Sequence, residues 1–119
     1  MKIINKNLNK AYKKPPLIIA EISGNHAGNK RRFLNLIERA FTCGANLVKI
    51  QTYEPIDITL KKKNKKFKIT SGTWKNKYLW DLYKKACTPF DWHYDAFKVA
   101  KKLNKKIFSS PFSLRAVDL

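Results

Sequence analysis

The sequence predicts an α/β fold built from parallel βαβ units, and the main evidence is three apolar stretches that each end in polar residues. These stretches cover residues 17–21, 47–52 and 106–110, and helical patterns fill the two intervals between them. Strands that alternate with helices favour a parallel sheet, whose chemistry lies at the carboxyl ends of the strands. We therefore expect a carboxylate, an ammonium with an amide, and two hydroxyls to meet at one edge of the sheet.

The length limits how much of such a fold the chain can hold. A closed (β/α)8 TIM barrel takes roughly 250 residues, whereas this chain has 119 residues. We expect the incomplete amino-terminal part of a TIM barrel, about three strands long, with residues 1–15 as a basic lead-in and residues 16–119 as the partial barrel domain. Residues 113–119 resemble the start of a helix with no stop signal after it.

The first interval predicts a helix, which follows a loop of small, turn-forming residues at positions 23–28. Gly44 is suited to the left-handed position that ends a helix. From Asn29 onward apolar residues recur at helical spacing, and they are Phe33, Leu34, Leu36, Ile37, Ala40 and Phe41. The second strand should begin shortly after Gly44.

The second strand places two polar side chains on one face. Side chains alternate along a strand, so Lys49 and Gln51 share a face. The aliphatic Val48 and Ile50 share the opposite face, which we expect to meet the helices, so that the polar pair points into the barrel interior. A buried charge rarely lacks a partner, and Glu21 on the neighbouring strand can provide one. A polar network that serves only stability is the alternative.

The second interval is unusual because residues 53–88 far exceed the ~2–6 residues of a typical βα loop. It contains a short β-like segment at residues 67–70 and then a pattern typical of a short helix. The aromatic residues of this connection cover either a substrate or the core. For Leu79, Leu82 and Tyr83, which have helical spacing, we favour the core.

A second long helix should start at residue 88. Thr88 is suited to cap it, with Pro89 in the first turn and Asp91 placed to complete a capping box. We expect His93 to be a surface residue of this helix and not a metal ligand, whereas His26 follows the first strand and is a candidate site residue. The expected sheet-facing side consists of Phe90, Trp92, Phe97, Val99, Ala100 and Leu103.

The formal net charge of +18 raises the possibility of nucleic-acid binding. The lysines, however, are scattered through the amino-terminal residues, the 61–66 loop and the helices, and only four arginines are present. No helix-turn-helix, zinc-finger or aromatic RNA-binding motif accompanies them. The pattern favours a solvated surface over a nucleic-acid partner.

The remaining composition indicates a cytoplasmic chain without a membrane partner. Cys43 and Cys87 are too few, and too far apart in the sequence, for a disulfide framework or a zinc site. No apolar run approaches the ~18 residues of a membrane span. Residues 1–16 are basic without the hydrophobic core of a signal peptide.

Three motifs resemble the sialic acid synthase family in order and in content. They cover residues 18–26, 44–53 and 108–112, and the likeness extends from about residue 16 to the last residue. Residues 80–83, 86–93 and 116–118 are most similar to the branch of that family whose sugar substrate is a diacetamido trideoxy hexose.

The resemblance implies a condensation of phosphoenolpyruvate with an open-chain amino-sugar aldehyde, giving a nonulosonic acid and phosphate. Positive groups would hold the anionic substrate, and a divalent metal, manganese or magnesium, would polarise the aldehyde. The resemblance also implies a homodimer for the full-length enzyme.

The resemblance assigns a role to individual residues. Lys49 would contact phosphoenolpyruvate, and Glu21 would lie near the sugar and the metal. Gln51 and Ser110 would complete the rim, with Asn25, His26 and Phe112 nearby. The metal ligands of the family and its antifreeze-like domain belong to segments beyond Leu119, so we expect the 119-residue chain alone to hold no metal and to be inactive.

Three interpretations stay open at this point. The first is the amino-terminal part of a synthase, either of the branch named above or of an N-acetylneuraminate-forming type. The second is an inactive remnant of such a gene, because an isolated three-stranded sheet leaves an unpaired edge. The third is a basic nucleic-acid-binding protein.

Overall fold

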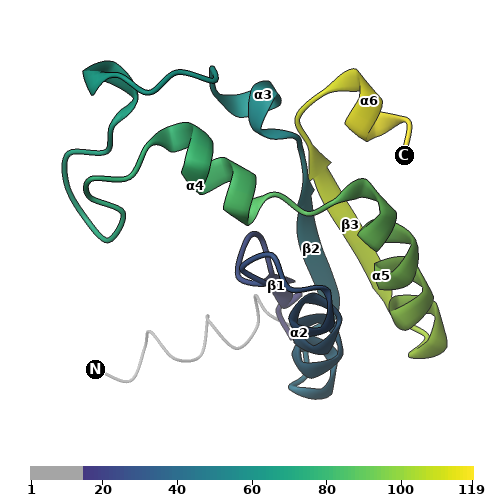
Figure 1. The fold of residues 1–119 in the computed structure, drawn as a ribbon. Coiled ribbons are helices and arrows are strands. Elements are labelled where there is room, and N and C mark those ends of the chain that lie inside the picture. The colour runs from purple at the N-terminus through teal and green to yellow at the C-terminus, as the bar shows by residue number, and fades with distance from the viewer. Residues whose placement is uncertain (1–14) are drawn as a thin grey trace, which may run out of the picture.

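A three-stranded parallel sheet with helices packed on one face forms the centre of the structure (Figure 1). The computed structural model describes residues 15–119, so the expected lead-in lies outside the described residues except for Pro15. The elements are, in order, β1 (Ile19–Glu21), α2 (Lys30–Thr42), β2 (Leu47–Thr52), α3 (Pro55–Ile58), the 3-10 helix η1 (Lys65–Phe67), α4 (Leu79–Ala86), α5 (Phe90–Lys102), β3 (Lys106–Pro111) and α6 (Leu114–Val117). The predicted α/β class is confirmed.

The strand order β1-β2-β3 places β2 in the middle, and both neighbours run parallel to it. The register pairs Glu21 with Lys49 and Gln51 with Ser110, so the carboxyl ends of all three strands lie at one edge. β1 is shorter than the sequence predicts. The backbone of Ile18 instead meets Asn46, whose side-chain oxygen accepts its N–H at 2.8 Å.

The predicted alternation along β2 is confirmed. Val48 and Ile50 are fully buried, whereas Lys49 and Gln51 on the opposite face are only partly buried. The apolar face packs against helices α2 and α5, whose core residues are Phe33, Ile37, Phe41, Ala96 and Ala100. The helices α2 and α5 thus cover one face of the sheet, and they do not cover the face that carries Lys49.

Helix α2 forms as the sequence predicts. The Asn29 side chain accepts a hydrogen bond from the backbone N–H of Arg32, which caps the helix. Its buried residues Phe33, Ile37 and Phe41 recur every four positions and so share one face. Gly44 has a φ of +101°, the left-handed conformation expected after the helix end.

Helix α5 differs from its prediction at the start. Pro89, not Thr88, is the N-cap residue, and no side chain caps the helix. The Thr88 hydroxyl bonds to the ring of His26 at 3.1 Å instead, so it is unavailable to the helix end. His93, predicted to lie on the surface, is buried.

The core-facing side of α5 agrees with the predicted one in part, because Trp92, Val99 and Ala100 lie in or against the core. Its fully buried positions are His93, Ala96 and Ala100, while Phe97 is 43% and Leu103 37% exposed. Small alanine side chains let α5 lie close to both α2 and β3, which fixes which side faces inward.

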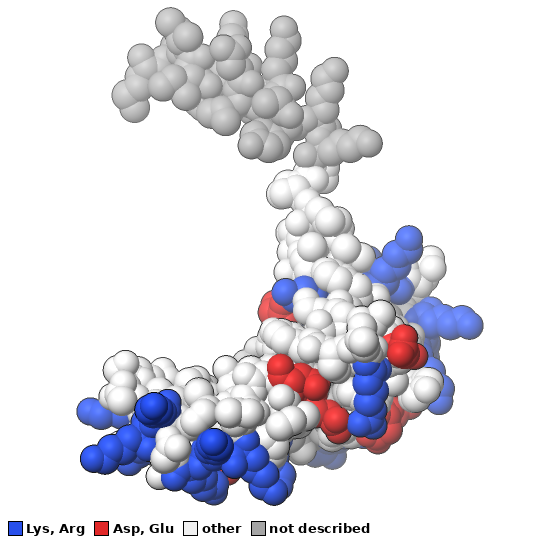
Figure 2. All heavy atoms as spheres, turned by 90° about the horizontal axis from the view of Figure 1, so that it is seen from above, with Lys and Arg blue, Asp and Glu red and all other residues white. Residues whose placement is uncertain are grey.

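The connection between β2 and α5 is an arm that carries α3, η1 and α4 (Figure 1). The predicted β-like segment is confined to one antiparallel bridge between Lys68 and Tyr78. Lysines gather over this arm (Figure 2), and residues 61–66 are exposed. Lys61, Lys63 and Lys77 lie over the rings of Trp80, Tyr78 and Trp74, at 5.8, 5.9 and 5.0 Å from the ring centres.

The predicted opening of a last helix is confirmed by α6. The side chain of Ser113 caps it by accepting the N–H of Ala116 at 3.3 Å. Within residues 15–119, no helix is both long and apolar enough to span a membrane.

Candidate active site

The centre of the candidate site is an ion pair between the ends of two neighbouring strands. Glu21 is the last residue of β1 and lies beside Lys49 of β2 in the sheet register. The Lys49 Nζ is 2.5 Å from a carboxylate oxygen of Glu21, and the other oxygen accepts the Ser23 hydroxyl at 2.8 Å. The side chains are 33% and 38% exposed, so the pair is held in place yet remains reachable by a ligand.

Two polar side chains continue this surface toward the carboxyl ends of the strands. Gln51 lies two residues beyond Lys49 on the same face of β2, and Ser110 is its partner in β3. Both residues are partly buried. The structure therefore brings together four of the predicted site residues, Glu21, Lys49, Gln51 and Ser110, on one face of one sheet.

Phe112 and Asn25 flank this surface. The Phe112 backbone N–H donates to the carbonyl of Thr52, and its ring meets Tyr53 edge to face with centres 5.6 Å apart. The Phe112 side chain is 45% exposed. Asn25 bonds through its side-chain amide to the Ile22 carbonyl at 2.9 Å, which ties the loop after β1 to the strand.

His26 does not join these residues, and its expected place at the rim is corrected by the structure. Its ring is fully buried between Phe33 and Trp92, with ring centres 5.5 and 5.4 Å away. The Gly28 N–H donates to His26 Nδ1 at 3.0 Å, so Nε2 carries the proton and donates to the Thr88 hydroxyl. Burial lowers the pKa of His26. The neutral ring connects the loop after β1, through Gly28, to Thr88 before α5.

A pocket of about 800 Å³ opens beside the polar face of the sheet. Asn25 and Gln51 line it from the sheet side, and Trp74, Tyr78 and Tyr83 line it from the arm. Leu82 and Tyr83, expected in the core, are thus partly buried pocket residues. Helical spacing shows which residues share a face of α4, but not whether that face meets core or cavity.

The pocket contains functional candidates that the sequence did not indicate. Arg32, Lys77 and Lys85 give it positive charge, and Asp81 is its carboxylate. Tyr53 lies at its floor, and burial raises the pKa of its phenol to about 12, so the hydroxyl stays protonated. The unusual length of the 53–88 connection was the signal in the sequence that could have directed attention to these residues.

The described part of the chain does not assemble a metal site. Among residues 15–119, no three side chains of the histidine, cysteine, aspartate or glutamate type converge. Glu21 is occupied by Lys49 and Ser23. These residues therefore do not fit a metal by themselves, and no step of the chemistry is assigned to a metal held by them.

Known proteins match this chain in sequence. The model of the NeuB family matches residues 36–119, which include Lys49, Gln51, Ser110 and Phe112. A pseudaminic acid synthase from Helicobacter pylori is 42% identical over 105 residues, 88% of this chain and 31% of the relative. A pseudaminic acid synthase from Campylobacter jejuni is 40% identical over 118 residues, 99% of this chain and 33% of the relative.

A solved structure is similar as well. The N-acetylneuraminic acid (sialic acid) synthetase from Leptospira borgpetersenii, crystallised with citrate, aligns with a TM-score of 0.68 and 25% identity. The alignment covers 88% of this chain and 32% of that structure. The chain spans about a third of the length of the curated relatives that it matches.

Fold and site together define an α/β chain of the TIM-barrel type with charged side chains at the carboxyl ends of its strands. The chain belongs to the NeuB family. The predicted resemblance to sialic acid synthases is confirmed, and so is the predicted branch. Pseudaminic acid synthases match at 40–42% identity, and an N,N'-diacetyllegionaminic acid synthase from Campylobacter jejuni matches at 33% over 107 residues.

Proposed function

We propose that this chain supplies the phosphoenolpyruvate-contacting part of a nonulosonic acid synthase of the pseudaminate type. The reaction condenses phosphoenolpyruvate with a diacetamido trideoxy hexose and releases phosphate. The observation that carries the proposal is the Glu21–Lys49 pair, which neighbouring parallel strands hold in register at a partly exposed surface. The names of the 40–42% identical relatives support the reaction.

Lys49 is the anion-binding group in this proposal. Phosphoenolpyruvate carries a carboxylate and a phosphate, and an ammonium binds either one as a compact charge with several donors. Glu21 holds this ammonium in place before the substrate arrives. An incoming anion that takes over the ammonium leaves the Glu21 carboxylate free to face the sugar.

The other residues of the rim have orienting roles. Gln51 offers an amide donor and acceptor, and Ser110 offers a hydroxyl, at neighbouring positions of β2 and β3. Asn25 and Gln51 also line the pocket, where Arg32, Lys77 and Lys85 favour an anionic ligand. The exposed Phe112 ring closes one side of the surface.

A divalent metal ion, manganese or magnesium, belongs to this proposal as the group that polarises the sugar aldehyde when it is bound. Residues 15–119 do not form its site. The homodimer and the cytoplasmic location expected from the sequence stay predictions.

The test is a hybrid enzyme in which this chain replaces the matching third of the Campylobacter jejuni pseudaminic acid synthase. We expect the hybrid to release phosphate from phosphoenolpyruvate only when a diacetamido trideoxy hexose and manganese or magnesium are present. Circular dichroism and a melting curve establish that the hybrid is folded. A folded hybrid that releases no phosphate with any sugar would contradict the proposal.

The second candidate is an N-acetylneuraminate-forming enzyme, which the likeness to the Leptospira borgpetersenii synthetase favours. The same assay separates the two candidates when N-acetylmannosamine replaces the diacetamido sugar. Faster release of phosphate with N-acetylmannosamine would establish this second candidate.

A further inference from the structure

A second polar cluster lies behind the rim and has no part in the chemistry proposed above. It consists of His93 from α5, Thr52 from β2 and Ser109 from β3. His93 and Thr52 are each 1% exposed, so neither can touch a ligand directly. Buried polar groups are costly unless they are fully hydrogen-bonded, and such groups specify one arrangement of the elements that carry them.

The hydrogen bonds of this cluster have one consistent direction. His93 Nδ1 lies 3.2 Å from the carbonyl oxygens of Pro89 and of Phe90, so it carries the proton and donates it to them. The neutral ring then accepts at Nε2, where the Thr52 hydroxyl donates at 2.7 Å. The Thr52 hydroxyl has then given its proton to His93, so its oxygen accepts from the Ser109 hydroxyl at 2.5 Å, in preference to the Ile50 carbonyl, which lies 3.4 Å from the Ser109 oxygen. A chain of hydrogen bonds thus runs from β3 through β2 to the start of α5.

The position of this chain links it to the site. Thr52 directly follows Gln51, and Ser109 directly precedes Ser110, while Gln51 and Ser110 are partners in the sheet register. Side chains alternate along strands, so the buried hydroxyls face the helices while Gln51 and Ser110 face the rim. A shift of the backbone that carries one of these hydroxyls also moves its rim neighbour, because a single peptide unit joins the two residues.

We propose that His93, Thr52 and Ser109 form a hydrogen-bonded clamp that fixes Gln51 and Ser110 relative to each other at the ends of β2 and β3. The three residues are positioning residues, because they act through their neighbours and not on the ligand. The part of this proposal that concerns phosphoenolpyruvate rests on the proposed function. The part that concerns the geometry of the strand ends does not.

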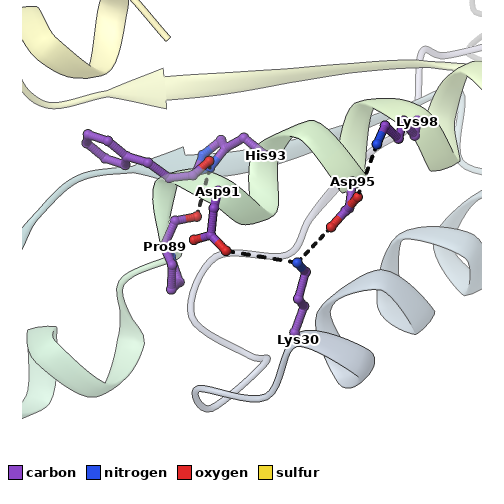
Figure 3. Close-up of polar contacts among 7 residues, drawn as sticks. Lys30, Pro89, Asp91, His93, Asp95 and Lys98 are labelled. Atoms are coloured by element: carbon purple, nitrogen blue, oxygen red, sulfur yellow. Dashed lines mark hydrogen bonds and ion pairs between the residues drawn. The ribbon is translucent and has the colours of Figure 1, made fainter.

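The surroundings of His93 are consistent with this role. Figure 3 shows His93 on the side of α5 that faces the strands, whereas Asp91 and Asp95 point toward Lys30 of α2. Lys30 Nζ is 2.7 Å from Asp95 and 4.0 Å from Asp91, so both carboxylates face α2 and neither bonds to the ring. Burial lowers the pKa of His93, which keeps Nε2 free to accept from Thr52.

The test compares Thr52→Val, which removes the hydroxyl at nearly constant shape, with Thr52→Ser, which keeps it. The control is Thr42→Val, because the exposed Thr42 hydroxyl at the end of α2 donates to the Arg39 carbonyl of its own helix at 3.0 Å and takes no part in the clamp. Nuclear magnetic resonance of the ligand-free protein reports the backbone amides of Gln51 and Ser110 and the ring nitrogens of His93.

We expect Thr52→Val to move the amide resonances of Gln51 and Ser110 and the Nε2 resonance of His93, whereas Thr52→Ser and Thr42→Val leave them near their original values. If Thr52→Val does not fold, Ser109→Ala tests the clamp in its place. This variant removes only the hydroxyl at the β3 end of the hydrogen-bonded chain, and it should still move the amide resonance of Ser110. Unchanged Gln51 and Ser110 resonances in the folded variant would overturn the clamp.

Binding of phosphoenolpyruvate gives the second measurement. We expect Thr52→Val to raise its Kd at least about tenfold, because small displacements of orienting groups weaken a site strongly, and Thr52→Ser to restore it to within about threefold. A Kd that Thr52→Val leaves unchanged would overturn the positioning role. An unmodified protein that does not bind phosphoenolpyruvate would count against the proposed function, and the resonances would still decide the clamp.

Discussion

Gly24 in the loop after β1 has no room for a side chain beside Ala86 of helix α4, and Gly24→Ala should disturb this packing severely. A Cβ at Gly24 would lie 2.7 Å from the Ala86 Cβ, 3.0 Å from its carbonyl oxygen and 3.1 Å from its Cα. Carbon atoms rest at about 3.5–4.0 Å, so one of the two segments must move by roughly 0.8 Å. Ala86 has no flexible side chain that could yield, so the backbone itself must shift.

The expected cost follows from this overlap. Overpacking of a close contact destabilises by about 1–3 kcal/mol, which corresponds to a Tm lower by roughly 5–20 °C in a domain of about 100 residues. Gly24 is not among the glycines with a positive φ, so the cost is steric and not conformational. Both Gly24 and Ala86 line the pocket, so the shift also changes its shape.

A double-mutant cycle with Ala86→Gly isolates the contact. Removal of the Ala86 Cβ relieves the 2.7 Å overlap, so the double variant should be more stable than the two single effects predict, by at least about 1 kcal/mol. Urea unfolding followed by tryptophan fluorescence measures each free energy. Gly72→Ala is the control, because Gly72 has no atom within 4 Å of the added Cβ and should not couple to Ala86→Gly.

Two results would refute this reasoning. One is a Gly24→Ala protein whose free energy of unfolding stays within about 0.3 kcal/mol of the parent. The other is strict additivity in the cycle, which would mean that the Ala86 Cβ is not the source of the overlap.

Two further predictions concern pH and charge. Burial lowers the pKa of His26 and of His93, whereas the unfolded chain binds these protons near pH 6.5. Stability should therefore be fully present above about pH 6.5 and fall as the pH drops below it, by up to about 1.4 kcal/mol per pH unit for each histidine. Urea midpoints that are flat from pH 7 to pH 5 would contradict this. If the lysines of the arm form only a solvated surface, duplex DNA should bind weakly and be released between about 50 and 200 mM salt, while phosphoenolpyruvate raises the Tm. Tight, sequence-selective DNA binding, together with no effect of phosphoenolpyruvate on the Tm, would contradict the proposed synthase function and favour the nucleic-acid-binding interpretation.

The sequence predicted those features that depend on local pattern. The alternation of Lys49 and Gln51 with aliphatic residues defined both faces of β2, because side-chain direction has a period of two residues. The pairing of Lys49 with Glu21 followed from the parallel arrangement of their strands. The first feature needs only the sequence of β2, and the second needs only the knowledge that β1 and β2 are parallel neighbours.

The features that the sequence did not predict depend on contacts between distant segments. His26 bonds to Thr88, 62 positions away, and His93 bonds to Thr52, 41 positions away. A histidine or threonine in a polar stretch is typical of a surface or a helix cap, and nothing local marks it as buried. Tyr83 likewise faces a pocket that α4 forms with Asn25 and Gln51, which are distant in the sequence, and no helical period can reveal this.

The most direct test of the central claim is the effect of Lys49→Ala on catalytic efficiency in the hybrid enzyme described above. An ammonium that holds a multiply charged anion should be worth a few kcal/mol, so kcat/KM for phosphoenolpyruvate should fall by roughly a hundredfold or more. Lys49→Arg should restore only part of the activity, because the guanidinium fork differs in shape from an ammonium. Lys101→Ala, which removes an exposed lysine of α5, is the matched control and should change little. A Lys49→Ala enzyme within about threefold of its parent would show that Lys49 only stabilises the sheet.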